Sequence, residues 1–257
     1  MSLEYFLFID SGIGGISTLA HVSKLSNANY IYYADNKHCP YGSHSKEDVF
    51  GFLKEIILKI QKKHHLKAVI LACNTATTTS IDQLRQRFPD IIFIGTEPAI
   101  KLASKMKFKN VLCLVTPSTA GQEKYLKLKK TCVDSKITTF SPKNLALKIE
   151  NFSCDNSYFN LCMLLRDLFS ILKKCQNHKF DCIVLGCTHY ALIKDIIAKF
   201  TTLPLIDGNN GVANRIKHLS FNKNNGIMPH VAFKFSLRKS NLTQKYKKCY
   251  NKYLQIL

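Results

Sequence analysis

Short apolar runs recur along the chain at intervals that leave room for a helix between them. They are nearly continuous in hydrophobic residues, which is typical of strands covered on both faces. The segments between them carry apolar residues at a spacing of three to four, the period of an amphipathic helix; residues 45–65 and 156–178 are examples. The alternation of the two patterns predicts an α/β fold with largely parallel sheets. The expected strands are residues 5–10, 29–35, 67–73, 91–96, 110–116, 136–141, 181–187, 203–208 and 231–236.

Two of these runs resemble each other. AVILACNTATTTSI (68–81) and CIVLGCTHYALI (182–193) both end an apolar strand with a small residue, a cysteine and a threonine-bearing turn that opens a helix. This duplication predicts two similar α/β domains, one of residues 1–98 plus 209–257 and one of residues 99–208. The strand at 231–236 and the lysine-rich tail would complete the first domain. Because ligands bind at the carboxyl ends of strands in open α/β sheets, we expect the active site in the cleft between the domains.

The formal net charge of +20 raises the question of a nucleic-acid partner. The charge is mostly lysine, scattered in doublets such as Lys62-Lys63 and Lys173-Lys174, without a stripe of arginine and aromatic residues. We therefore expect no specific nucleic-acid partner. The N-terminal residues lack the pattern of a secretory signal, and no apolar stretch reaches the roughly 20 residues of a membrane span. A cytoplasmic protein with no membrane partner is expected.

Ten cysteines are spread along the chain, most of them in apolar runs such as those around Cys113 and Cys162. We interpret them as buried, reduced thiols that behave as small hydrophobic side chains, and not as a disulfide framework. Cys182 and Cys187 lack the close spacing of zinc ligands, so no structural metal is expected.

Cys73 and Cys187 differ from the rest, because each follows a strand and opens a helix. At that position unpaired backbone N–H groups and the positive end of the helix dipole favour the thiolate. A single cysteine of this kind is more often an inert core residue, but two in matching motifs indicate a pair of acid–base groups. Inversion of a carbon centre needs a base on one face and an acid on the other, which two opposed cysteines provide.

Polar residues accompany both cysteines. Asn74 and Thr75 follow the first, and Thr188 follows the second; such neutral groups can orient a zwitterion, cap a helix, or do both. His189 stands two residues after Cys187 and can exchange protons with it near neutral pH.

The first strand ends in DSGIGG, residues 10–15. Glycines at a strand-to-helix turn let the backbone approach a carboxylate or phosphate, although the pattern is neither a P-loop nor a dinucleotide fingerprint. A ligand-binding turn and a plain tight turn both fit it.

Five motifs in order carry a family resemblance over nearly the whole chain. They are DSGIGG (10–15), YYADNKHCPYGSHS (32–45), ACNTAT (72–77), GTEPAIK (95–101) and LGCTHYALI (185–193). The set resembles the motif series of glutamate racemases, and the Pro40-Tyr41-Gly42 element sets it apart from aspartate and hydantoin racemases.

The resemblance implies two racemase domains that close over glutamate, without pyridoxal phosphate or metal, to supply D-glutamate for the bacterial cell wall. Cys73 would act on the D-enantiomer with the help of Asp10, and Cys187 on the L-enantiomer with the help of His189. Glu150, in LKIEN, would correspond to a glutamate near the substrate and is counted as a catalytic residue together with Cys73, Cys187, Asp10 and His189. The substrate-binding residues would be Asp10, Ser11, Tyr41, Gly42, Asn74, Thr75, Thr119, Thr188 and His189.

The resemblance has departures as well. Val115 precedes Thr116 where the family usually has glycine, and the surroundings of Glu150 diverge. Asp10 lies too near the start for the N-terminal extension by which some relatives respond to a cell-wall precursor, so such activation is not expected.

The expected partner is thus the small-molecule substrate glutamate, with no cofactor, and a homodimer is compatible with the sequence. Three other interpretations remain open: a racemase or isomerase of another small dicarboxylate, a thiol hydrolase, and a basic nucleic-acid-binding protein. A hydrolase would use one cysteine with a histidine and an acid and would leave the duplicated cysteine unexplained.

Overall fold

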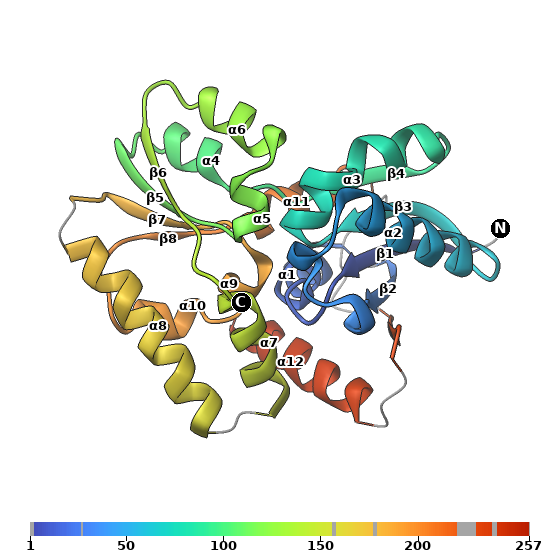
Figure 1. The fold of residues 1–257 in the computed structure, drawn as a ribbon. Coiled ribbons are helices and arrows are strands. Elements are labelled where there is room, and N and C mark those ends of the chain that lie inside the picture. Colours follow the sequence, from blue (N-terminus) through green and yellow to red (C-terminus); the bar gives the residue numbers. More distant parts are fainter. Residues whose placement is uncertain are drawn as a thin grey trace. The chain divides into compact units, whose positions relative to one another are not determined.

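The computed structural model describes residues 3–26, 28–155, 158–176, 179–219, 230–237 and 241–256 of the 257-residue chain. The chain divides into two compact units, Met1–Thr96 with Asn209–Leu257, and Glu97–Gly208. Each unit is a parallel sheet flanked by helices (Figure 1). The α/β class with largely parallel sheets, predicted from the apolar runs, is confirmed, and a strand forms in each of those runs.

The first unit contains a five-stranded sheet in the order β4-β3-β1-β2-β9, and every neighbouring pair is parallel. Its elements are β1 (Glu4–Asp10), α1 (Ile16–Leu25), β2 (Asn29–Ala34), the 3-10 turns η1 (Asn36–His38) and η2 (Tyr41–Ser43), α2 (Lys46–Gln61), β3 (His65–Leu71), α3 (Asn74–Arg87), β4 (Ile92–Gly95), α11 (Asn209–Lys217), β9 (Val231–Phe235) and α12 (Leu242–Ile256).

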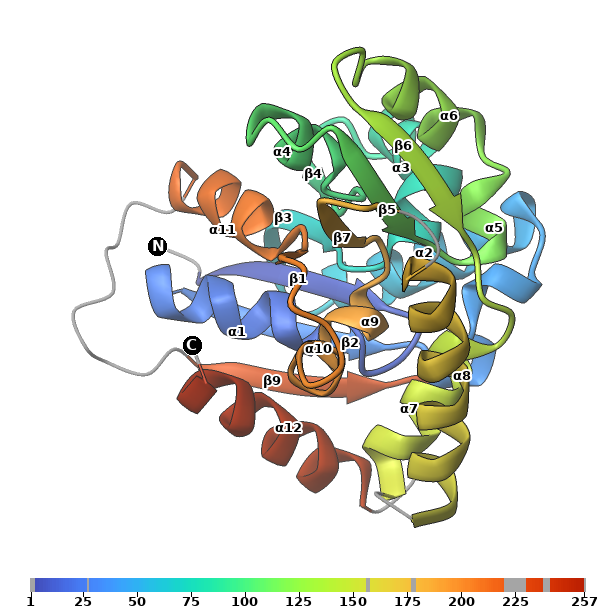
Figure 2. The same ribbon diagram turned by 90° about the vertical axis from the view of Figure 1, so that its left-hand side faces the viewer.

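Both faces of this sheet are apolar because helices cover both. Leu7 and Ile9 of β1 point to the face covered by α2 and α3, where they share a core with Val49, Leu53 and Leu84. The alternate residues of the strands point to the face of α1, α11 and α12, and Figure 2 shows α1 between the other two helices. The apolar runs in the sequence are continuous because helices cover the strands on both faces of the sheet.

β9 joins the sheet from far along the chain, as its apolar pattern predicts. It pairs with β2 from Tyr30↔Val231 to Ala34↔Phe235. Aromatic rings then connect it to the C-terminal helix: Phe235 lies edge-on to Tyr246 at 4.9 Å between centroids.

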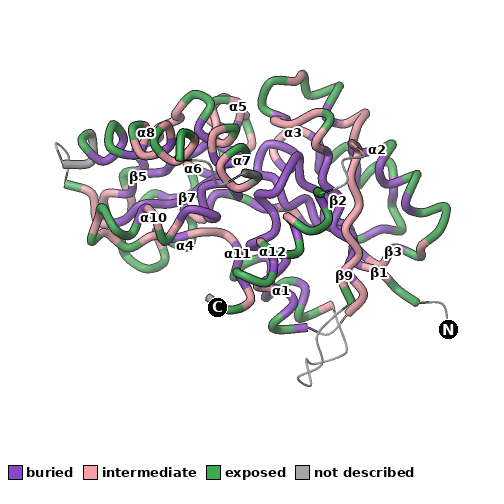
Figure 3. Tube along the Cα trace, turned by 90° about the horizontal axis from the view of Figure 1, so that it is seen from below, coloured by how far each residue is buried: buried purple, intermediate pink, exposed green. Residues whose placement is uncertain are grey.

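The second unit contains a four-stranded parallel sheet in the order β6-β5-β7-β8. Its core on one face combines strand residues such as Val111 and Val184 with Ile100 of α4 and Leu128 of α6. The tube in Figure 3 shows β5 and β7 as buried. The elements are α4 (Ile100–Lys105), β5 (Asn110–Leu114), α5 (Pro117–Ala120), α6 (Glu123–Lys130), β6 (Lys136–Phe140), α7 (Leu145–Asp155), α8 (Tyr158–Gln176), β7 (Cys182–Leu185), α9 (Thr188–Ala191), α10 (Lys194–Ala198) and β8 (Leu205–Ile206).

Two helix expectations need correction or restriction. The helical pattern at 45–65 gives α2, which starts after the N-cap Ser45 but ends at Gln61, because His65 already belongs to β3. Of the pattern at 156–178, the structure describes α8, while residues 156, 157, 177 and 178 lie outside the described residues.

The interpretation of the cysteines as buried is wrong for Cys162, which is exposed on α8. Leu164 and Leu168 take the inward face of that helix, and Cys162 falls on another face. Cys39 and Cys249 are only half-buried, whereas Cys113, Cys132 and Cys182 are buried in the second unit. Eight cysteines in the described part of the chain are free thiols.

Candidate active site

Cys73 stands between the end of β3 and the start of α3. It is the N-cap of that helix, in an extended conformation (φ −133°, ψ 123°), and is 8% exposed. Thr77, one turn further on, donates a hydrogen bond to the Leu71 carbonyl at 3.3 Å and accepts one from the Thr96 N–H at 3.0 Å. These bonds fix the first turn of α3 against the ends of β3 and β4, and with it the position of the thiol.

Asn74 and Thr75 form the first turn of α3, and both are buried. Among the described residues, Asn74 Oδ1 has no hydrogen-bond partner. A buried polar atom left without a partner costs about 1–3 kcal/mol, so a ligand that donates a hydrogen bond here would be stabilised.

Asp10 ends β1 and is fully buried, with its carboxylate accepting a hydrogen bond from the Gly12 N–H at 2.8 Å. Ser11 follows it and is also buried. A Cβ placed on Gly15 would lie 2.6 Å from the Cβ of Ala72, the residue before Cys73. The glycine therefore lets the turn after β1 pack directly against the end of β3, next to Cys73.

Tyr41 begins η2 and is buried, while Gly42 is exposed. The Tyr41 hydroxyl donates to Asp35 Oδ2 at 2.9 Å. Burial, followed by the charge of Asp35, raises the pKa of Tyr41 well above its usual value, and Cys73 and Asp10 add to the effect. Tyr41 is therefore a neutral hydroxyl close to both Cys73 and Asp10.

Cys187 occupies the corresponding position in the second unit, between β7 and α9. It is an N-cap in the same extended conformation (φ −141°, ψ 137°) and is 6% exposed. Thr188 and His189, the next two residues, are buried as well.

Glu150 of α7 lies beside this second cysteine motif. Its Oε2 is 2.7 Å from Nε2 of His189, and both side chains are buried. Helices α7 and α9 pack against each other, which brings together residues 39 positions apart. A carboxylate on one ring nitrogen orients the imidazole.

Thr119 lies in α5, just after β5. It is fully buried, and its hydroxyl is 2.9 Å from that of Thr116, the N-cap of this helix. Val115, which precedes Thr116, is buried directly against Gly186.

Replacing Gly186 with alanine tests that packing. The added Cβ would lie 2.7 Å from Val115 Cγ1 and 2.8 Å from the Leu114 carbonyl oxygen, which is backbone and cannot move away cheaply. We expect Gly186→Ala to lower the free energy of unfolding by about 1–3 kcal/mol, measured by urea denaturation. Gly121→Ala is the matched control, because nothing lies within 4 Å of a Cβ at that position. Equal losses in both variants would contradict the packing argument.

The structure thus groups the candidate residues by unit. Asp10, Tyr41 and Cys73 lie close together in the first, and Glu150 and His189 in the second. Sequence reasoning assigned no role to Asp35, although it lies within the motif YYADNKHCPYGSHS directly after a strand. It also passed over Tyr190, whose buried hydroxyl has no partner in the described part of the chain and whose pKa is raised by burial and by nearby Cys187.

Metal clusters and membrane spans are both missing from the described residues. Among them, no cluster of three or more His, Cys, Asp or Glu side chains is arranged to hold a metal ion. No helix in the same part of the chain has the length and apolar character of a membrane span.

Comparison with known proteins gives consistent matches. Residues 14–216 match the family model of Asp/Glu/Hydantoin racemase. The glutamate racemase of Clostridium acetobutylicum is 37% identical over 213 residues, which is 81% of each chain. That of Clostridium botulinum is 34% identical over 222 residues, 84% of each chain.

Solved structures agree with these matches. The Escherichia coli glutamate racemase, in complex with L-glutamate and the activator UDP-MurNAc-ala, is 25% identical, with a TM-score of 0.81 over 98% of this chain and 95% of that one. Glutamate racemase from Campylobacter jejuni shares the fold, with a TM-score of 0.78 at 23% identity over 96% of this chain and 98% of that one. With a family match over most of its length and curated relatives above 30% identity, this chain belongs to the Asp/Glu/Hydantoin racemase family.

Proposed function

We propose that this chain is a glutamate racemase that interconverts L- and D-glutamate by two-base proton transfer at Cα, with Cys73 and Cys187 as the two bases. One observation carries the mechanism: both cysteines are N-caps in the same extended conformation after a buried strand, each with its own ionisable neighbour. The curated relatives named above, which bear the name glutamate racemase, support the choice of substrate.

From L-glutamate, the Cys187 thiolate removes the Cα proton and becomes a thiol. The electron pair of the broken C–H bond stays on Cα and is delocalised into the carboxylate. The Cys73 thiol then gives its proton to the opposite face, which forms D-glutamate and leaves Cys73 as the thiolate. The reverse reaction starts from that state, so the enzyme needs no net oxidation, no cofactor and no metal.

Neighbouring groups make these transfers feasible. His189, oriented by Glu150, assists Cys187, and Asp10 assists Cys73. The Cα proton is weakly acidic, so its removal needs preorganised donors around the developing charge. We assign that task to backbone N–H groups, the Asn74 amide and the hydroxyls of Ser11, Thr75 and Thr188. Substrate binding is assigned to Asp10, Ser11, Tyr41, Gly42, Asn74, Thr75, Thr119, Thr188 and His189.

We further propose that the enzyme is cytoplasmic and that the reaction supplies D-glutamate for peptidoglycan synthesis. The net charge of +20 would draw an anionic substrate toward the protein. We propose no specific nucleic-acid partner and no membrane partner. A homodimer is consistent with this role.

Solvent labelling tests the mechanism directly. When pure L-glutamate is incubated in heavy water and sampled early, each new D-glutamate molecule should carry deuterium at Cα, because Cys73 delivers a solvent-equilibrated proton. The remaining L-glutamate should stay almost fully protiated, since Cys187 returns the proton that it removed. Chiral separation followed by mass spectrometry measures both pools.

A single shared base would give a different pattern, with unlabelled D-glutamate at early times; that result would refute the two-base mechanism. Aspartate, assayed in parallel, tests the substrate. Faster racemisation of aspartate than of glutamate would move the assignment to another dicarboxylate.

A further inference from the structure

A buried carboxylate of the first unit lies next to the candidate site without a role in the chemistry proposed above. Asp35 follows β2, is 1% exposed, and its backbone N–H donates to the carbonyl of Asp10 at 2.9 Å. Its side chain takes two partners: the Tyr41 hydroxyl at 2.9 Å, and Nδ1 of His38 at 3.0 Å. A buried carboxylate with two such partners holds both of them in place.

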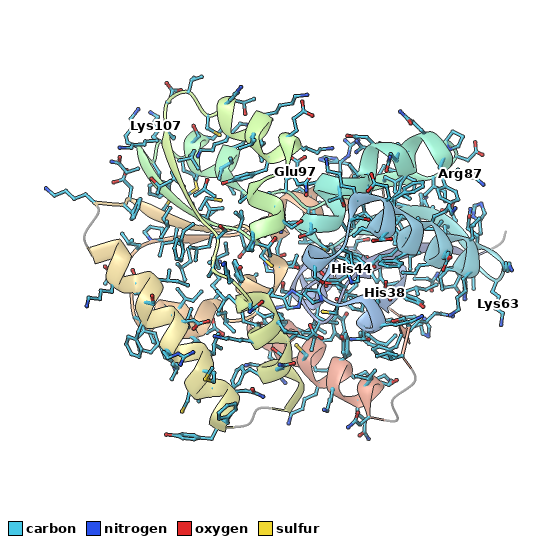
Figure 4. The ribbon with its side chains drawn as sticks, viewed as in Figure 1. His38, His44, Lys63, Arg87, Glu97 and Lys107 are labelled. Carbon is cyan, nitrogen blue, oxygen red and sulfur yellow. The ribbon has the colours of Figure 1, made fainter. Side chains whose placement is uncertain are left out.

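The His38 ring is itself held in one orientation. It stacks on Phe52 of α2, with 3.7 Å between ring centroids and planes only 5° apart. His44 lies edge-on to the same Phe52 ring at 5.3 Å, and Figure 4 labels both histidines. With the ring fixed by stacking, Nδ1 points at Asp35, and the chain of contacts runs from α2 through His38 and Asp35 to Tyr41.

This arrangement also decides what Tyr41 can do. Its hydroxyl proton is committed to Asp35, so toward its other neighbours, Cys73 and Asp10, the oxygen offers only lone pairs. Loss of the Asp35 carboxylate would release the Tyr41 hydroxyl proton for other acceptors and would also let the Tyr41 ring change its orientation.

We propose that Asp35 and His38 are positioning residues that fix Tyr41, and through it the substrate-binding turn Tyr41–Gly42. Both act through Tyr41, so their effect is on substrate affinity and not on proton transfer. The inference rests on the proposed function, because it assigns Tyr41 to glutamate binding.

The test is a double-mutant cycle of Asp35→Asn and Tyr41→Phe, read through KM and kcat for glutamate. Asp35→Asn keeps the shape of the side chain and removes its charge, and should raise KM about tenfold, the loss expected for one hydrogen bond to a charged group, with a much smaller change in kcat. Tyr41→Phe should raise KM to a similar extent. The double variant should be no worse than the poorer single variant, because both changes break the same contact.

A matched control is Asp82→Asn, since Asp82 is an exposed carboxylate on α3 that forms an ion pair with exposed Arg85 at 3.3 Å. It should leave both constants unchanged. If Asp35→Asn does not fold, His38→Leu replaces it in the cycle, because the partly exposed His38 side chain can be exchanged for an apolar one that still packs on Phe52.

Three results would overturn the inference. They are an unchanged KM in both Asp35→Asn and His38→Leu, a fall in kcat without a rise in KM, and effects on KM that multiply in the double variant. A wild-type protein that does not racemise glutamate would refute the proposed function itself. Failure of the proposed function can thus be told apart from failure of the positioning role of Asp35 and His38.

Discussion

Replacing Cys73 or Cys187 with alanine is expected to lower kcat/KM for glutamate by at least about 10⁴-fold, the scale seen when a group that transfers a proton or bonds to the substrate is removed. Each thiol would be the base on one face of Cα, and a base on the other face cannot replace it. Because L- and D-glutamate have equal free energies in water, kcat/KM must fall by the same factor in both directions. Circular dichroism of either enantiomer with time measures the loss.

The second unit supplies controls for this experiment. Burial raises the pKa of Cys113 to about 12 and that of Cys182 to about 11, so both stay protonated thiols at neutral pH. Cys113→Ala and Cys182→Ala should keep turnover near wild type while lowering the free energy of unfolding by about 1–3 kcal/mol. A loss of activity in either that matched Cys187→Ala would show that the cysteine pair is misassigned.

His189→Asn is expected to lower kcat/KM by about 10²–10³-fold, within the range of a general acid–base contribution. The asparagine side chain has a similar size but cannot exchange a proton with Cys187. Glu150→Gln should cost less, about tenfold, because in the proposed mechanism Glu150 orients His189 through the 2.7 Å contact.

His218→Asn serves as the control, because His218 is an exposed histidine on the turn after α11. It should leave kcat/KM unchanged. A larger loss in Glu150→Gln than in His189→Asn would mean that the carboxylate, and not the imidazole, takes part in proton transfer.

The sequence alone determined the strands and the positions of the two cysteines. A strand covered on both faces must be apolar throughout, so β1, β3, β5 and β7 are visible as continuous hydrophobic runs. The end of such a run is equally visible, and a residue that follows it and precedes a helical pattern is an N-cap. The hydrophobic pattern is therefore sufficient to place Cys73 and Cys187 at strand-to-helix junctions.

Only the tertiary structure decided which polar residues meet. Glu150 reaches His189 because α7 packs on α9, and Asp35 holds Tyr41 and His38 because the turns after β2 fold back on the strand end. The outward position of Cys162 was likewise decided by which face of α8 is buried, the one that carries Leu164 and Leu168. Hydrophobic periodicity indicates which residues of a helix or strand face the core. It carries no information on which residues of another element they will contact there. That information arises only when elements distant in sequence pack together.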